Sequence, residues 1–134
     1  MEMMQRRCAV VSLILLGLSL SGHSLAVAAG ATPRDAVKLY FEASKAGDIE
    51  TIKQVIGGSF YNRRRVLLEE NEEYSMFLRE YYQGAQLQVG NVAIKDDVGV
   101  VTVRIWFPAG TVDTQKLLVK MDSAGLWIIV DEVH

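Results

Sequence analysis

The hydrophobic pattern of this chain changes its period once, and that change constrains the fold more than any other feature. Up to about residue 82 the apolar residues recur at helical spacing, and from about residue 85 they alternate with polar residues as in β-strands. A chain with its helices first and its strands afterwards is typical of the α+β class, in which the helices cover one face of an antiparallel sheet. We therefore expect a two-layer domain.

The first helix carries clear start and stop signals. Thr32 can cap it, Pro33 suits the first helical position, and acidic Asp35 suits the first turn. Gly47 fits the left-handed residue that ends a helix, and Asp48 can cap a second helix immediately afterwards. The sequence therefore predicts two helices joined without a linker.

Two further boundaries complete the helical half. Gly57 and Gly58 are expected to stop the short second helix. A third, longer helix is predicted from about Asn62 to Tyr82, because apolar residues there repeat at helical spacing. These residues are Leu67, Tyr74, Phe77, Leu78 and Tyr81.

Four strands are expected in the second half. In residues 85–94 the apolar positions change parity at Gly90 and Asn91, which predicts a bulge or sharp bend. Residues 99–107, 111–122 and 126–133 follow as an antiparallel meander, the last with Trp127–Val130 buried on both faces. The inward-facing side chains of the two middle strands are predicted to be Val101, Val103, Ile105, Phe107, Leu117, Val119 and Met121.

The N-terminal segment is typical of a secretory signal peptide. Arg6 and Arg7 precede the apolar run 8–20, and Ala26-Val27-Ala28 fits a small-residue cleavage site. We therefore predict a signal peptide at residues 1–28, one domain at 29–134, and a periplasmic or extracellular location. The alternative is a retained membrane anchor, because residues 8–29 carry no charge, although polar residues 21–24 interrupt that run.

Composition narrows the classes of function. The only cysteine, Cys8, lies in the predicted leader, so the predicted mature domain would have neither disulfides nor a catalytic thiol. Setting aside Arg6, Arg7 and Glu2 leaves 12 basic and 15 acidic residues, a net charge of about −3 that disfavours nucleic acid as a partner. No motif for zinc, a phosphate-binding loop or a nucleophile triad is present. We expect no metal, no nucleotide and no other cofactor.

The order of elements resembles a known superfamily. The stretch "TPRDAVKLYFEASKAGDIETIKQVI", a long helix and four strands ending in "GLWIIVDEV" are similar to the nuclear transport factor 2-like, cystatin-like proteins, in particular small exported bacterial domains of unknown function. The sharpest local element is Ala46-Gly47-Asp48. The resemblance implies three helices packed on a curved four-stranded sheet, closed into a cone with a cavity inside.

Aromatic residues are the candidates for ligand binding in such a cavity. Tyr40, Phe41, Tyr61 and Tyr74, together with Tyr81, could contact an apolar molecule with their rings and orient it with their hydroxyls. The alternative is that these rings simply fill the core.

Enzymes of the superfamily, such as ketosteroid isomerases and polyketide cyclases, place a carboxylate or histidine in the cone near a tyrosine. Here the position expected for the isomerase base reads Gly57–Tyr61, without a carboxylate, and the only histidine of the predicted mature domain is the terminal His134. Asp131 and Glu132 remain candidates for an acid or base, because adjacent strand residues point to opposite faces. The alternative is a solvated strand end. We therefore name no catalytic residue.

Two surface features suggest other partners. The run Arg63–Arg65 could bind an anionic ligand or an acidic partner, or be ordinary surface charge balanced by neighbouring glutamates. Arg104, Trp106 and Leu118 on the outer sheet face form a candidate interface, flanked by Lys116 and Lys120. The resemblance makes a homodimer through that face a reasonable hypothesis.

The preferred hypothesis is an exported, non-enzymatic accessory domain that recognises a small apolar ligand or a protein partner in the cell envelope. One alternative is an enzyme of isomerase or cyclase type that uses a pocket carboxylate and a tyrosine. Another is a structural homodimer that supports an envelope assembly. Membrane contact is expected only through an uncleaved leader.

Overall fold

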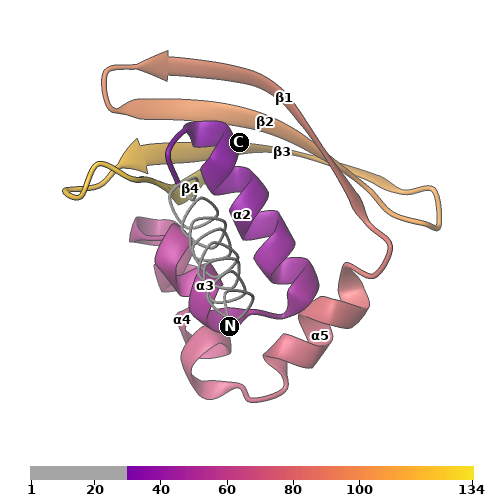
Figure 1. Ribbon diagram of the computed structural model, residues 1–134. Coiled ribbons are helices and arrows are strands. Elements are labelled where there is room, and N and C mark those ends of the chain that lie inside the picture. Colours follow the sequence, from indigo (N-terminus) through magenta and orange to yellow (C-terminus); the bar gives the residue numbers. More distant parts are fainter. Residues whose placement is uncertain (1–29) are drawn as a thin grey trace, which may run out of the picture.

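The computed structural model describes residues 30–134 and has two layers (Figure 1). Its sheet is antiparallel, with the strand order β1-β2-β3-β4, and the helices lie on one face of it. The expected α+β class is confirmed. In chain order the elements are α2 (Pro33–Ala46), α3 (Ile49–Val55), α4 (Gly58–Glu70), α5 (Tyr74–Tyr81), β1 (Gln86–Lys95), β2 (Val98–Trp106), β3 (Val112–Met121) and β4 (Trp127–Val133).

The predicted leader, residues 1–28, lies outside the described residues. From residue 30 onward, no helix has the length and apolarity needed to cross a bilayer.

The joint between α2 and α3 forms as the sequence predicts. The Thr32 hydroxyl accepts a hydrogen bond from the Asp35 amide at 3.1 Å at the start of α2. Gly47 ends the helix in the left-handed region, with φ of 67°. The Asp48 carboxylate accepts from the Thr51 amide at 3.2 Å and caps α3. Glycine termination and aspartate capping therefore meet at consecutive residues.

The predicted third helix is wrong in one respect, because it is two helices. α4 begins at Gly58, earlier than expected, and ends at Glu70; a turn then leads into α5. Asn71 makes this turn: its side-chain oxygen accepts from the Glu73 amide at 3.0 Å, and its carbonyl accepts from the Tyr74 amide at 3.2 Å. An asparagine side chain competes in this way with helical hydrogen bonding. The break lets α4 pack on β4 while α5 packs on α2.

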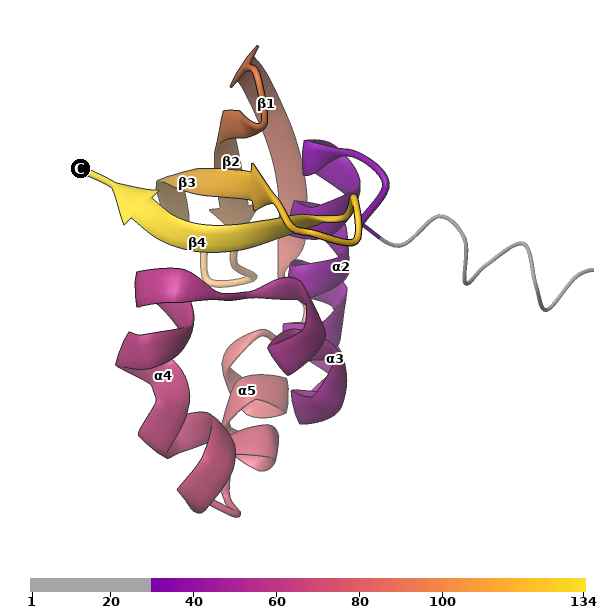
Figure 2. The same ribbon diagram turned by 90° about the vertical axis from the view of Figure 1, so that its left-hand side faces the viewer.

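The sheet is strongly twisted. In Figure 2, β1 and β2 run upright while β3 and β4 cross them, so the sheet wraps around the helical layer. The β1–β2 register shifts between Val89 and Val92, at the predicted bulge. A second shift, between Leu118 and Val119 in the β3–β4 ladder, is not evident from the sequence. Bulges increase the local bend of a strand, which suits a curved sheet.

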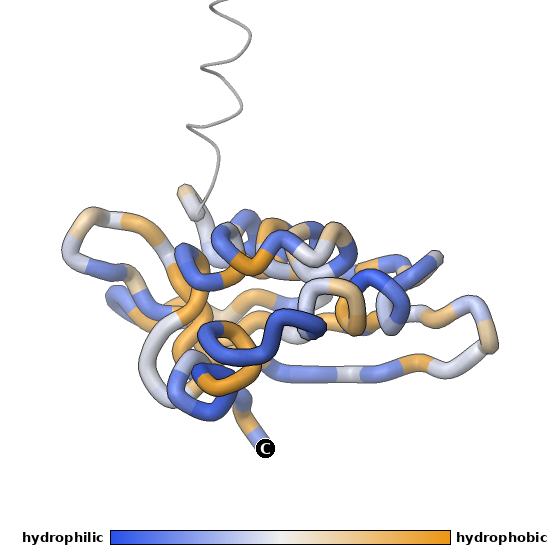
Figure 3. The backbone as a smooth tube through the Cα atoms, turned by 90° about the horizontal axis from the view of Figure 1, so that it is seen from below, coloured by the Kyte–Doolittle hydropathy of each residue, from blue (hydrophilic) through white to orange (hydrophobic). Residues whose placement is uncertain are grey.

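The core lies between the inner sheet face and the helices. Val101, Val103, Ile105, Leu117 and Val119 are buried, as predicted. Figure 3 shows hydrophobic and hydrophilic residues interspersed along the helices and strands, the pattern expected of elements with one buried face.

Two predicted inward residues are less buried than expected. Phe107 is half-buried, and Met121 is 37% exposed. Met121 pairs with Trp127 at the end of the β3–β4 ladder, and Phe107 lies just beyond the end of β2. Strand ends are less completely covered by the helical layer than strand centres.

The last strand is covered on one face and along one edge. Trp127 and Ile129 are buried, whereas Ile128 and Val130 are half-buried. The prediction that this strand is buried on both faces is therefore only partly correct. The Gly57 amide donates to the Ile129 carbonyl at 2.8 Å, and Ile56 forms a parallel bridge to Ile129. The chain entering α4 therefore covers part of this sheet edge.

Candidate functional site in the cone

The interior of the cone is a small cavity between α2, α4 and the inner sheet face. Its volume is about 50 Å³. The helical side contributes Val37, Tyr40, Phe41, Ser44, Phe60, Arg64 and Tyr82, and the sheet contributes Leu87, Val103, Ile105, Gln115 and Leu117. The cavity wall is therefore mixed, with apolar side chains and polar groups both contributing to it.

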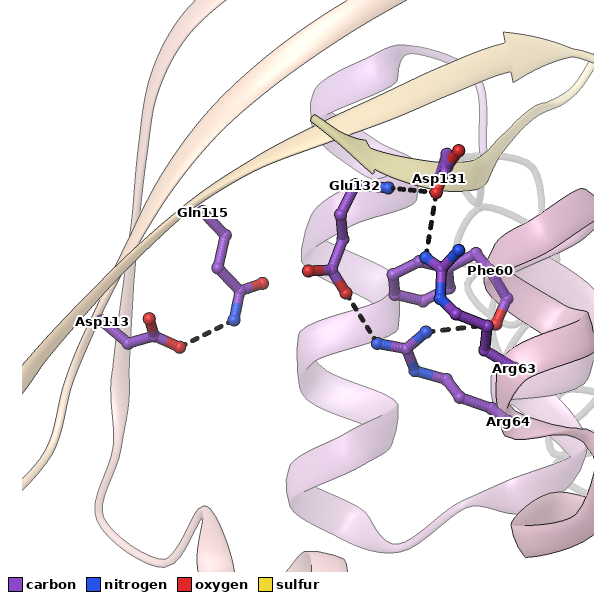
Figure 4. A network of polar contacts seen from close by, with 7 residues as sticks. All are labelled: Phe60, Arg63, Arg64, Asp113, Gln115, Asp131 and Glu132. Atoms are coloured by element: carbon purple, nitrogen blue, oxygen red, sulfur yellow. Dashed lines mark hydrogen bonds and ion pairs between the residues drawn. The ribbon is translucent and has the colours of Figure 1, made fainter. Parts of the chain in front are cut away.

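Arg64 is the most constrained of these polar groups. Its guanidinium carbon lies 3.5 Å from the centroid of the Phe60 ring, and it donates to the Phe60 carbonyl at 3.1 Å. It also donates to Glu132 Oε1 at 2.9 Å, joining α4 to β4 (Figure 4). The side chains of Arg64 and Glu132 are only 22% and 26% exposed. A guanidinium fixed by an ion pair, a carbonyl and a ring has little freedom to reorient.

Three tyrosines of the helical layer are shielded from water, and their pKa values are raised. Burial is the main cause that raises the pKa of Tyr40, Tyr74 and Tyr82 above the usual value, although Arg64 partly opposes this at Tyr40 and Tyr74. The Tyr40 ring packs edge-on against Phe60 at 5.4 Å between centroids. At neutral pH these neutral hydroxyls can both donate and accept hydrogen bonds.

The predicted ligand residues divide into two groups. Tyr40 and Phe41 line the cavity, with Phe41 buried. Tyr61 and Tyr74 pack against the core from its edge and do not line the cavity. Tyr81 is 52% exposed and lies outside the cone, because the turn at Asn71 sets α5 apart from α4.

Asp131 and Glu132 both form ion pairs with arginines of α4 (Figure 4). Asp131 Oδ1 accepts from Arg63 at 2.9 Å, and this hydrogen bond is the largest cause lowering the pKa of that carboxyl. Glu132 lies on the inner face with Arg64 (Figure 4). Within residues 30–134 neither carboxylate is hydrogen-bonded to a tyrosine. The consecutive arginines are thus explained by two consecutive carboxylates on β4.

Sequence reasoning missed the polar pair on β3. Gln115 lines the cavity, and its amide donates to Asp113 Oδ2 at 2.7 Å (Figure 4). The signal was present, because both residues are in phase with buried Leu117 and Val119 in the two-residue period. Tyr82 was also missed: it follows the last residue of α5 and packs edge-on against Phe41 at 5.7 Å.

The volume of the cavity limits what it can hold. Ligand pockets for small organic molecules enclose roughly 300–1,000 Å³. The 50 Å³ of this cone is on the scale of one or a few water molecules. The rings of Tyr40, Phe60 and Phe41 therefore fill most of the space that the fold encloses.

A larger hollow lies outside the cone, between the end of α4 and α5. This α4–α5 groove has a volume of about 600 Å³ and is lined by Leu67, Asn71, Glu73, Tyr74, Met76, Phe77 and Glu80. Met76 is 56% exposed and Phe77 is 55% exposed. The Phe77 ring stacks on Tyr74 at 6.1 Å and on Tyr81 at 5.7 Å between centroids.

The outer sheet face carries the predicted interface residues, but they are spread along it. Trp106 is 46% exposed and pairs with Val112, which is 39% exposed. Half-buried Leu118 pairs with Val100, which precedes Trp106 by six residues in β2. At about 3.3 Å per residue the two apolar positions are roughly 20 Å apart, and exposed Arg104 lies between them.

Comparisons of sequence and structure with known proteins identify the fold of this chain but not its activity. No family model matches the sequence, and no curated protein is similar in sequence. The solved structures do contain matches, at low identity.

Three of these structures are similar to this chain over most of its length. A Campylobacter jejuni protein provisionally named an NTF2-like transpeptidase has a TM-score of 0.54 and 10% identity, covering 75% of this chain and 99% of its own. An NTF2-like protein of unknown function from Silicibacter pomeroyi has a TM-score of 0.51 and 18% identity, covering 85% and 95%. A SEC-C motif-containing protein from Rhodopseudomonas palustris has a TM-score of 0.53 and 16% identity, covering 78% and 80%.

At such identities a structural match establishes shared architecture and leaves activity open. The helices on a curved antiparallel sheet, the glycine–aspartate joint and the matches to two NTF2-like structures agree. This chain has the nuclear transport factor 2-like fold.

Proposed function

We propose that this chain is an exported, non-enzymatic accessory domain that binds a protein partner in the cell envelope. The observation that carries the proposal is the α4–α5 groove, in which two large apolar side chains, Met76 and Phe77, are more than half exposed. Apolar patches of this kind on soluble domains commonly mark interaction sites. Export rests on the leader sequence alone.

The small volume of the cavity in the cone favours a protein partner over a small-molecule ligand. Its 50 Å³ leave no room for an organic molecule unless the surrounding elements move apart. Phe60 is 1% exposed and packs on both Tyr40 and Arg64, so opening the cone would break several contacts at once.

The state of the carboxylates supports a binding role over catalysis. General acid–base catalysis by a carboxyl group requires a proton-transferring group within reach of substrate and with a matched pKa. Asp131 has a lowered pKa and is bound to Arg63, whereas Glu132 is bound to Arg64. An isomerase-type mechanism would have to break one of these ion pairs first.

Crosslinking in the native host tests the proposal. The tagged domain should be crosslinked to one stoichiometric protein, and Phe77→Glu should abolish the adduct, because a charge would be buried in the contact. Ile94→Glu is the matched control, since Ile94 is 53% exposed and lies on the β1–β2 hairpin. A small molecule retained in native mass spectrometry, with no protein adduct, would contradict the proposal.

A homodimer through the outer sheet face is the second candidate. The exposed Trp106–Val112 pair favours it, since large side chains in apolar interface cores contribute most to association. Sedimentation of the mature domain should then show a dimer that Trp106→Glu dissociates. A wild-type monomer at high micromolar concentration would remove this candidate.

A further inference from the structure

The α4–α5 groove is bordered by negative charge. The segment between Leu67 and Tyr81 contains five glutamates and one basic residue, Arg79; the glutamates are Glu69, Glu70, Glu72, Glu73 and Glu80. Among the ion pairs of residues 30–134, only Lys53–Glu69 involves one of these five. A Cβ atom at Gly47 would lie 3.0 Å from Arg79 Cγ, so Arg79 packs on the α2–α3 joint. Of the five glutamates, Glu73 and Glu80 line the groove, and no basic residue is among its lining residues, so its rim is acidic.

The centre of the same groove is apolar and adaptable. Leu67 comes from α4, and Met76 and Phe77 come from α5, with Glu73 and Glu80 on the lining beside them. Unbranched methionine fits partners of varied shape, and an apolar hollow between helices is a common seat for the apolar stripe of another helix.

We infer that the α4–α5 groove binds one amphipathic helix of a partner protein whose apolar stripe is flanked by lysine or arginine. The inference rests on the proposed function and adds the chemistry of the partner. The partner's apolar residues pack on Met76 and Phe77, and its basic residues lie opposite Glu73 and Glu80. Such charge complementarity speeds association and selects against acidic competitors.

The same charges argue against two other occupants. An anionic membrane surface would be repelled by the acidic rim, although the exposed apolar residues could enter a bilayer. A second copy meeting groove to groove would bring the glutamates of the two copies together, and like charges in a contact disfavour it.

Three synthetic peptides of about 18 residues, five helical turns, test the inference. The first is an amphipathic Leu/Lys helix, the second its Leu/Glu counterpart, and the third the Leu/Lys peptide with two central prolines. Fluorescence anisotropy with the domain, residues 29–134, should show the first binding at least about tenfold more tightly than the other two. Raising the salt concentration should weaken binding, because the rim charges are exposed.

Variants locate the binding. Phe77→Glu should weaken the Leu/Lys peptide about tenfold or more, even though it adds a negative charge, because the apolar contact is lost. Ile94→Glu adds the same charge elsewhere and should leave the affinity unchanged. Glu73→Gln with Glu80→Gln should weaken binding and reduce its salt dependence. Circular dichroism of each variant verifies that it is folded.

Four results would overturn the inference. They are equal binding of the Leu/Glu peptide, equal binding of the proline peptide, full affinity in Phe77→Glu, and adsorption to phosphatidylglycerol vesicles that Phe77→Glu abolishes. A Phe77-dependent crosslink in the host to a protein without a basic helix would overturn this inference and leave the proposed function standing. If the wild-type domain formed no crosslink to any protein in the host, that result would instead contradict the proposed function.

Discussion

At the scale of single residues, Gly47 shows how one position meets two demands. Its φ of 67° lies in the left-handed region, and its carbonyl accepts a hydrogen bond from the Ser75 hydroxyl at 2.6 Å. A Cβ atom there would lie 2.6 Å from the Ser75 carbonyl oxygen. The helix pattern of the sequence suggests the first demand, a left-handed backbone at Gly47. The second demand, space for Ser75, arises only because α5 packs on the joint.

Gly47→Ala should therefore destabilise the domain by roughly 2–4 kcal/mol, from backbone strain and from displacement of α5. Chemical denaturation gives the free energy of unfolding. Gly125→Ala is the control, because Gly125 also has a positive φ, of 81°, but nothing lies within 4 Å of its added Cβ. Equal losses of unfolding free energy in the two variants would show that contact with α5 does not contribute to the effect at Gly47.

At the scale of elements, α4 is attached to the sheet mainly at one end. Among its residues only Phe60 and Leu68 are buried, and the pairs of Arg63 with Asp131 and of Arg64 with Glu132 tie it to β4. The sequence shows two arginines and two carboxylates 68 residues apart, but no periodicity indicates that they meet. Their pairing depends on the direction in which α4 leaves Gly57.

Asp131→Asn tests this attachment through its pH dependence. Arg63 lowers the folded-state pKa of Asp131 below its ordinary value of 3.8, so the folded state binds that proton less tightly than the unfolded state. The pair therefore stabilises the fold above about pH 4 and loses its contribution as the pH falls below that value. In urea denaturation the variant should be less stable than wild type at about pH 6, and the two should converge near pH 2.

Arg63→Gln should reproduce the effect, and the double variant should be no worse than either single one. A difference between wild type and Asp131→Asn that stays constant from about pH 6 to pH 2 would show that the pair contributes nothing through charge.

At the scale of the whole molecule, the fold buries one large aromatic side chain in its core and leaves another exposed on its surface. Phe60 is 1% exposed and contacts Tyr40 and Arg64 in the centre of the cone, whereas Phe77 is 55% exposed in the α4–α5 groove. A buried ring such as that of Phe60 stabilises the fold. An exposed ring such as that of Phe77 leaves apolar area available for association.

Phe60→Ala should lower the free energy of unfolding by about 3–5 kcal/mol, because it removes buried area and leaves a cavity. Phe77→Ala should lower it by less than about 1 kcal/mol. Thermal or chemical denaturation of both variants checks the contrast. Similar losses would mean that the groove is part of the structural core.

The sequence by itself determined the class of the fold, the Gly47–Asp48 joint, the bulge near Gly90 and most of the buried strand residues. Each of these depends on local geometry: a capping side chain, a left-handed glycine or a period of two residues. It did not determine the split of the third helix, because the Asn71 turn competes with a continuous helical stripe that looks equally good locally.

Only the tertiary structure decided how full the cone is and where apolar surface remains. Whether Tyr40, Phe41 and Phe60 line a hollow or fill it depends on the angle between α2, α4 and the sheet, which no local pattern encodes. The exposure of Met76 and Phe77 likewise depends on where the Asn71 turn directs α5. Periodicity identifies which face of an element is apolar, whereas the packing of distant elements decides whether that face is covered.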